Sequence, residues 1–334
     1  MRGVDRLSEL QRWIESRLQV APLELEPASA DASFRRYFRV RVAADSFIAM
    51  DAPPAHEDCR PFVRIARLMA DAGLNVPRVI AEDFERGFLL LSDLGTAGYL
   101  QALNADSADE LFRDAIDALL RWQLASKPGV LPPYDEALLT RELQLFPEWY
   151  VVRHRALTLT AAQSAQLEAV FALILKNNLA QPAVYVHRDY MPRNLMICAP
   201  NPGVLDFQDA VYGPITYDLA SLFKDAFVSW DEARVLDWTI RYWEKARRAG
   251  LPVAADFGVF YRDFEWMGLQ RHLKVLGIFA RLNYRDGKPG YLADTPRFIA
   301  YVRAVAARYS ELRPLLTLLD EIEGHAPARA GYTF

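Results

Sequence analysis

Two short apolar strands near the middle of the chain, each next to a polar loop, constrain the fold and the chemistry most. The first apolar run, 184–186, leads into a loop that carries Asp189, and Asn194 follows five residues later. A second apolar run then ends at Asp206. The turn-rich segment 199–203 predicts a hairpin, which would bring Asn194 and Asp206 to the same end.

This order of residue types favours phosphoryl transfer. A hydroxyl that is phosphorylated needs a carboxylate to orient it and accept its proton, and Asp189 suits that role. A triphosphate needs a cation held by hard oxygen ligands, so we predict that Asn194 and Asp206 bind Mg²⁺. Arg188 and Arg193 flank the base and are predicted to steady it or to neutralise the transferred charge. Each residue alone is as well explained by turn or strand structure, but their order between apolar strands favours the catalytic interpretation.

Composition excludes several other classes of protein. The 334 residues leave room for two lobes, and 52% hydrophobic with 25% charged residues is ordinary for a globular protein. A net charge of −4 gives no basic surface for nucleic acid. Cys59 and Cys198 lie far apart and form no metal-ligand pair. Because no apolar stretch approaches roughly 18 residues, we expect no membrane segment and a cytoplasmic location. Protein partners are not indicated.

The first part of the chain predicts a small mixed sheet with one internal helix. Alternating apolar and polar residues indicate the strands, and apolar residues at helical spacing indicate the helices. The predicted strands cover 37–42, 46–50, 76–81 and 87–91, and the predicted helices cover 6–18 and 61–72.

Two segments of this part suit a nucleotide. A polar turn before the strand at 37–42 would cover phosphates with backbone N–H groups while an arginine supplies charge, although an ordinary turn with solvated arginines is the alternative. The end of the last strand marks a hinge where an adenine ring could bond backbone groups. The predicted nucleotide-binding residues are Ser33, Phe34, Arg35, Arg36, Leu91, Ser92, Asp93 and Leu94. We therefore predict a nucleotide-binding lobe over 1–94 and a helical lobe over 95–334.

The rest of the chain is predicted to be mainly helical. Ser107 and Glu110 have the spacing of a capping box. Asp218 lies near the start of a helix, where its side chain can cap the helix and hold the loop at 187–189 by hydrogen bonds. Further helices are predicted over 134–150, 160–178, 231–249, 255–283 and 294–317.

Three motifs follow one another in the chain: His-Arg-Asp-x-x-x-x-Asn at 187–194, Leu-Asp at 205–206 and Tyr-Asp-Leu-Ala at 217–220. In these motifs the chain resembles the aminoglycoside phosphotransferase and choline kinase group, relatives of the protein kinases. Five further segments are 31–39, 50–54, 91–95, 206–210 and 268–277. In them it resembles more closely the bacterial anomeric kinases of N-acetylmuramate and N-acetylglucosamine. The resemblance implies an α+β, protein-kinase-like bilobal fold and ATP-dependent phosphorylation of the sugar's C1 hydroxyl in peptidoglycan recycling.

One departure from the kinase pattern concerns the lysine that pairs with ATP. Met50 or Asp51 stands in its place, and the helix that follows carries arginines where a glutamate partner is expected. Arg35 and Arg36 are the first candidates to replace the lysine. Otherwise Mg²⁺ must neutralise more of the negative charge of the ATP phosphates. Two alternatives stay open: a phosphotransferase for another small alcohol, such as an aminoglycoside or choline-like substrate, and a nucleotide-binding pseudokinase.

The acceptor site is predicted from residue type alone. Sugars stack on aromatic faces, and a carboxylated lactyl group suits an arginine. The predicted substrate residues are Trp149, Trp266, Arg271 and His272. A tryptophan on a helix more often belongs to the core, and a buried polar network would also explain Arg271 and His272.

Overall fold

The computed structural model describes residues 3–29 and 34–324. The chain forms two compact units, the first from 1–125 with 192–210 and the second from 126–191 with 211–334. The first contains a five-stranded antiparallel sheet, and the second is mainly helical. This architecture confirms the predicted α+β class. The boundary predicted after residue 94 concerns functional lobes and stays a prediction.

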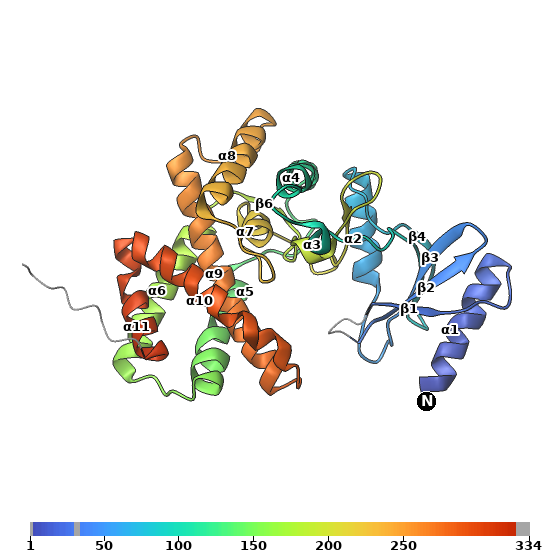
Figure 1. Cartoon of the computed structure of the whole chain (residues 1–334), viewed down its shortest axis with the longest axis horizontal. Coiled ribbons are helices and arrows are strands. Elements are labelled where there is room, and N and C mark those ends of the chain that lie inside the picture. Colours follow the sequence, from blue (N-terminus) through green and yellow to red (C-terminus); the bar gives the residue numbers. More distant parts are fainter. Residues whose placement is uncertain (1–2, 30–33, 325–334) are drawn as a thin grey trace, which may run out of the picture. The chain divides into compact units, whose positions relative to one another are not determined.

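The sheet of the first unit has the strand order β1-β2-β3-β5-β4. Its strands are β1 (Glu26–Ser29), β2 (Arg36–Val42), β3 (Asp45–Asp51), β4 (Val79–Asp83) and β5 (Phe88–Ser92). Phe38 and Val40 of β2 point to a core that α1 (Gly3–Leu18) closes with Leu10, Trp13 and Ile14. Figure 1 shows α1 lying along this sheet. The four predicted strands are confirmed with small shifts, whereas β1 was not predicted because Pro27 suits only an edge strand.

The first unit also contains three helices and a hairpin. The helices are α2 (Arg60–Asp71), α3 (Tyr99–Ala102) and α4 (Ala108–Leu124), and the hairpin consists of η2 (Pro192–Asn194), β7 (Leu195–Met196) and β8 (Gly203–Val204). The predicted capping box before α4 is wrong. Ser107 has helical backbone angles, and its hydroxyl donates to the Ala102 carbonyl oxygen instead of accepting from the helix. A capping side chain needs an extended backbone to point at the helix N–H groups.

The second unit packs around one long helix, α9 (Phe257–Tyr284), which passes among α5, α6 and α10 (Figure 1). Its other elements are α5 (Glu136–Leu145), η1 (Phe146–His154), α6 (Ala161–Leu179), β6 (Ala183–Val186), β9 (Val211–Pro214), α7 (Tyr217–Phe223), α8 (Glu232–Arg248), η3 (Pro289–Asp294), α10 (Thr295–Arg308), η4 (Ser310–Leu312) and α11 (Arg313–Glu323). Gly277 allows α9 to approach α5 closely, since a Cβ there would lie 2.3 Å from the Leu145 carbonyl oxygen.

Two of the predicted helices are interrupted. The helix predicted over 134–150 is an α-helix only to Leu145 and continues as the wider π-helix η1, because Pro147 has no N–H to donate to the α-helical ladder. The helix predicted over 294–317 breaks at Tyr309, whose backbone is extended, and resumes as α11 with Pro314 in its first turn.

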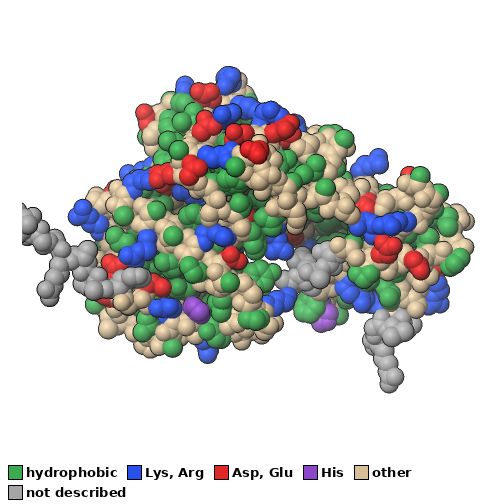
Figure 2. Space-filling model, viewed as in Figure 1, with side chains coloured by type: hydrophobic (Ala, Val, Ile, Leu, Met, Phe, Trp, Pro, Cys, Tyr) green, Lys and Arg blue, Asp and Glu red, His purple; other side chains and the backbone are tan. Residues whose placement is uncertain are grey.

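The surface agrees with the modest net charge. On the face drawn in Figure 2, basic and acidic side chains are interspersed, without a large patch of one sign. Among the helices of residues 3–29 and 34–324, none is long and apolar enough to cross a membrane.

Candidate active site

The loop after β6 carries the proposed base, and a buried carboxylate holds it. Asp218, at the start of α7, is fully buried and accepts the N–H of His187 at 2.7 Å and that of Arg188 at 3.0 Å. This confirms the hydrogen bonds to the loop that were predicted for Asp218, whereas the N-cap of α7 is Thr216, which makes no side-chain cap hydrogen bond. The next N–H, that of Asp189, donates to His187 Nδ1 at 3.2 Å. Arg188 has a φ of +77°, so Asp218 stabilises a backbone conformation that non-glycine residues rarely adopt.

Burial sets the protonation of this anchor. It raises the pKa of Asp218 to about 7, and the nearby Asp189 acts in the same direction. The two backbone N–H donors and the positive charge of Arg271 oppose this shift. The protonation of Asp218 is therefore sensitive to pH near neutrality.

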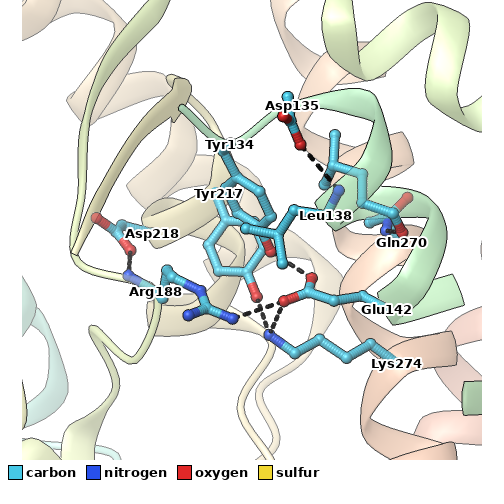
Figure 3. A network of polar contacts seen from close by, with 10 residues as sticks. Tyr134, Asp135, Leu138, Glu142, Arg188, Tyr217, Asp218, Gln270 and Lys274 are labelled. Atoms are coloured by element: carbon cyan, nitrogen blue, oxygen red, sulfur yellow. Dashed lines mark hydrogen bonds and ion pairs between the residues drawn. The ribbon is translucent and has the colours of Figure 1, made fainter. Parts of the chain in front are cut away.

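The side chain of Arg188 joins a buried network that sequence reasoning missed (Figure 3). Glu142 of α5 accepts from Arg188 Nη2 at 2.7 Å and from Lys274 Nζ at 2.9 Å. Tyr134 donates its hydroxyl to the other oxygen of Glu142, and Lys274 bonds the Tyr217 hydroxyl at 3.0 Å. Burial acts to raise the pKa of Glu142, but the charges of Lys274 and Arg188 outweigh it and lower the pKa. The network fixes Arg188 from α5 and α9.

The hairpin of the first unit brings the two predicted metal ligands together. β7 pairs with β8, and the Leu205 N–H donates to the Asn194 carbonyl oxygen at 2.9 Å. The Asn194 amide then lies 3.4 Å from Asp206 Oδ2, and Gln208 Nε2 donates to Asp206 Oδ1 at 2.9 Å. Asp206 has a φ of +63°, which turns its carboxylate at the end of the hairpin.

The residues of this hairpin fit a magnesium ion shared with a phosphate. One carboxylate and one amide oxygen are hard ligands, and Mg²⁺ in nucleotide sites takes its other ligands from phosphates and water. Within residues 3–29 and 34–324, no group of three or more His, Cys, Asp or Glu side chains could hold a metal alone. A cation bound here would therefore depend on the nucleotide.

The two arginines proposed to replace the lysine are held by different carboxylates. Arg36 pairs across the strands with Asp51 and forms an ion pair with it. Asp51 is fully buried and also accepts from Arg6 of α1 at 2.7 Å, so Arg36 belongs to the face that α1 covers. Arg35 comes one residue earlier, and its guanidinium donates two N–H groups to Glu57, at 3.1 and 3.2 Å. Arg35 precedes the first residue of β2, and its guanidinium is held by Glu57 rather than by Asp51.

In the predicted hinge, residues 91–94, the polar side chains of Ser92 and Asp93 already form hydrogen bonds within the protein. Asp93 accepts from both Arg39, at 2.6 and 3.1 Å, and Ser46, at 2.6 Å. Burial acts to raise the pKa of Asp93, but these hydrogen bonds outweigh it and lower the pKa. Ser92 accepts the N–H of Arg78 at 2.8 Å, and Leu91 is buried. The hinge is therefore held to the sheet through side chains.

The other predicted nucleotide-binding residues lie apart from these interactions. Phe34 is 63% exposed, and its ring stacks on that of His56. Leu94 would touch a Cβ placed on Gly203, at 2.9 Å, so it lies beside the hairpin. Ser33 lies outside the described residues.

Comparison with known proteins identifies the family. Residues 24–257 match the phosphotransferase enzyme family. The chain belongs to this family. Proteins named N-acetylmuramate/N-acetylglucosamine kinase from Pseudomonas putida and Pseudomonas aeruginosa are 56% and 53% identical to it, each over 97% of this chain and 98% of the relative. The ADP-bound crystal structure of the aminoglycoside phosphotransferase APH(2'')-Ib has the same fold, with a TM-score of 0.60 at 13% identity over 88% of this chain and 97% of that one.

The acceptor residues predicted for this phosphotransferase differ in burial. Trp149, in η1, is half-buried. Trp266 is 1% exposed and packs between Tyr309 and Arg262, so its indole presents no open face for a sugar. His272 is fully buried, and Arg271 lies beside it at 3% exposure.

The remaining predicted catalytic residue of the phosphotransferase, Arg193, is exposed in η2. The residues that sequence reasoning missed are Tyr134, Glu142 and Lys274. A signal for Lys274 was present, since a lysine stands inside the apolar run 268–277 and a buried amine needs a partner. For Glu142, on an amphipathic helix with other charges, the sequence offers no such signal.

Proposed function

We propose that the protein is a kinase that transfers the γ-phosphoryl group of ATP to the anomeric C1 hydroxyl of N-acetylmuramate and N-acetylglucosamine. The observation that carries this proposal is the Asp189 loop anchored on Asp218, in a chain that shares more than half its residues with kinases named for these sugars. ATP supply and the role of the product in peptidoglycan recycling are consistent with a cytoplasmic location.

In the proposed reaction, Asp189 accepts a hydrogen bond from the C1 hydroxyl and takes its proton late in the transfer. The sugar oxygen forms a bond to the γ-phosphorus, the bond from that phosphorus to the bridging oxygen breaks, and ADP leaves. Asn194 and Asp206 would hold Mg²⁺, which neutralises charge on the phosphates when bound. Arg188 serves by fixing the loop through Glu142, since its guanidinium is engaged there.

We assign the missing cation at the ATP phosphates to Arg35 rather than Arg36. Arg35 is held by Glu57, three residues before the start of α2. Phe62 of α2 packs on Phe207, the residue after Asp206, with 4.8 Å between ring centroids. Glu57 therefore leads into the helix that packs on the residue after Asp206. Arg36 points to the α1 face, where Asp51 binds it.

Variants of the two arginines test this assignment. Arg35→Met should raise the KM for ATP and lower kcat, on the order of 10- to 100-fold in kcat/KM, because one charged contact to the phosphates is lost. Arg36→Met makes the same change in charge one residue away and should act on stability, since it leaves Asp51 with one fewer cation. Equal effects of the two variants on the KM for ATP would contradict the assignment.

The function itself is tested by ADP release from Mg·ATP with N-acetylmuramate, N-acetylglucosamine, glucose, choline and kanamycin, with the phosphorylated position assigned by ³¹P NMR. A C1 phosphate on the N-acetyl sugars is expected. Turnover only with choline or kanamycin would overturn the sugar assignment, and ATP binding without any turnover would favour a pseudokinase. Asp189→Asn should bind nucleotide normally and lose turnover; normal turnover in that variant would remove Asp189 from the base role.

A further inference from the structure

Arg271 is a buried cation without a partner. It lies in the middle of α9 and is 3% exposed. Its buried Nη1 has no hydrogen-bond partner, and no hydrogen bond or ion pair joins its guanidinium to any residue in the described part of the chain. A guanidinium has five N–H donors and never loses its charge in proteins. A buried, unpaired charge of this kind is strongly unfavourable.

The other buried cations near Arg271 are paired. Lys274, one turn further along α9, contacts Glu142 at 2.9 Å, and Lys224, at the end of α7, lies 3.8 Å from Glu265. The fold therefore pairs these two lysines with carboxylates at close range, whereas Arg271 has only the longer-range charge of Asp218, whose two oxygens already accept backbone N–H groups. This contrast indicates that the partner of Arg271 comes from a ligand.

The surroundings of Arg271 include the anchor of the catalytic loop. Its positive charge lowers the pKa of Asp218, whose two oxygens already accept the backbone N–H groups of His187 and Arg188. On the adjacent position of α9, the His272 ring stacks on Tyr301 with 4.8 Å between centroids. Arg271 thus lies within electrostatic range of the carboxylate that positions the loop of Asp189, where the acceptor's hydroxyl must lie.

We propose that Arg271 binds a carboxylate of the acceptor and so distinguishes anionic from neutral sugars; this inference rests on the function proposed above. A guanidinium presents a planar pair of N–H groups that matches the two oxygens of a carboxylate. N-acetylmuramate carries such a carboxylate on its lactyl ether, and N-acetylglucosamine has a hydroxyl at the same position. The two acceptors therefore form a matched pair that differs in the group Arg271 recognises.

The test compares wild type and Arg271→Met with both acceptors. R271M should lower kcat/KM for N-acetylmuramate by about 10- to 100-fold, mostly through KM, because a charge-assisted contact is lost. Any effect of the lost charge on Asp218 acts on both acceptors alike, so the ratio of their kcat/KM values should still change by about 10- to 100-fold, and circular dichroism checks that the variant is folded. Arg271→Lys keeps the charge but not the paired N–H groups, so its loss should be intermediate.

Two variants on the same helix serve as comparisons. Lys274→Met breaks the network around Arg188 and should reduce turnover of both acceptors equally. Arg262→Met removes a partly exposed guanidinium that pairs with Glu311 and lies over Trp266, and should leave the ratio between the acceptors' kcat/KM values unchanged. An equal loss of kcat/KM for both acceptors in R271M would overturn the proposal, because Arg271 would then only balance the charge of Asp218. An unchanged kcat/KM for both acceptors would overturn it as well. If the proposed function itself is wrong, the wild-type protein will phosphorylate neither sugar, and this result is distinct from any effect of R271M.

Discussion

Replacing Glu142 by Gln is expected to destabilise the second unit by about 3–5 kcal/mol. The carboxylate lies 2.7 Å from Arg188 and 2.9 Å from Lys274, and the side chains of Glu142 and Lys274 are 6% and 10% exposed. Water can therefore solvate the two cations only poorly once the carboxylate is gone. The expected loss of folding free energy is that of a broken buried ion pair, not the roughly 0–1 kcal/mol of a surface pair. The amide keeps the volume of the side chain but leaves two neighbouring cations to repel each other.

The assay is urea unfolding of wild type, E142Q, Lys274→Met and the double variant, followed by tryptophan fluorescence and circular dichroism. Coincident transitions from the two probes would justify the free energies. The double variant should be about 1–3 kcal/mol more stable than the sum of the single losses predicts, because only one buried cation then lacks its carboxylate. A loss below about 1 kcal/mol in E142Q, or simple additivity, would refute the reasoning from burial.

Three further predictions concern pH, packing and metal. Burial and neighbouring positive charge hold the pKa of His272 well below 6.5, so the folded protein keeps it neutral while the unfolded chain takes up a proton below pH 6.5. Stability should therefore fall on acidification, by up to about 1.3 kcal/mol at pH 5.5 relative to pH 7, and His272→Phe should lose this component in urea unfolding at the two pH values. Gly277→Ala should cost about 1–3 kcal/mol in thermal melting because its methyl group would meet the Leu145 carbonyl, whereas Gly268→Ala, whose nearest neighbour is at 3.6 Å, should be nearly neutral. Removing metal with EDTA should abolish turnover, and Asp206→Asn should raise the Mg²⁺ concentration needed to restore it; unchanged Mg²⁺ dependence would exclude Asp206 as a ligand.

Sequence reasoning succeeded where structure depends on local pattern. Alternation located β2 and β3, and the turn-rich segment 199–203 located the hairpin of Asn194 and Asp206. The role of Asp218 followed from its place near a helix start after the polar loop. In each case, neighbouring residues of the chain determine the geometry.

The sequence could not indicate contacts between side chains on separate helices. Glu142 is 46 residues from Arg188 in the chain, and no spacing rule links a charge on α5 with one on α9 or in the loop. Burial was equally hidden: Trp266 was predicted to stack on a sugar, but packing against Tyr309 and Arg262 uses its faces. The wide turn of η1 was missed because a proline in a helical pattern can break, kink or widen a helix.

The acceptor role proposed for Arg271 would have a consequence for the divergence of substrate specificity, because Arg271 shares α9 with Lys274. The two residues are three apart in the buried middle of one 28-residue helix, and Gly277 allows that helix to lie against α5. A substitution that shifts or rotates α9 to accommodate a new acceptor would move the support of the catalytic loop in the same step. Lineages that change substrate should therefore exchange the side chain at 271 while keeping the backbone path of α9, and laboratory evolution should find most specificity changes among short side-chain replacements rather than insertions in this helix.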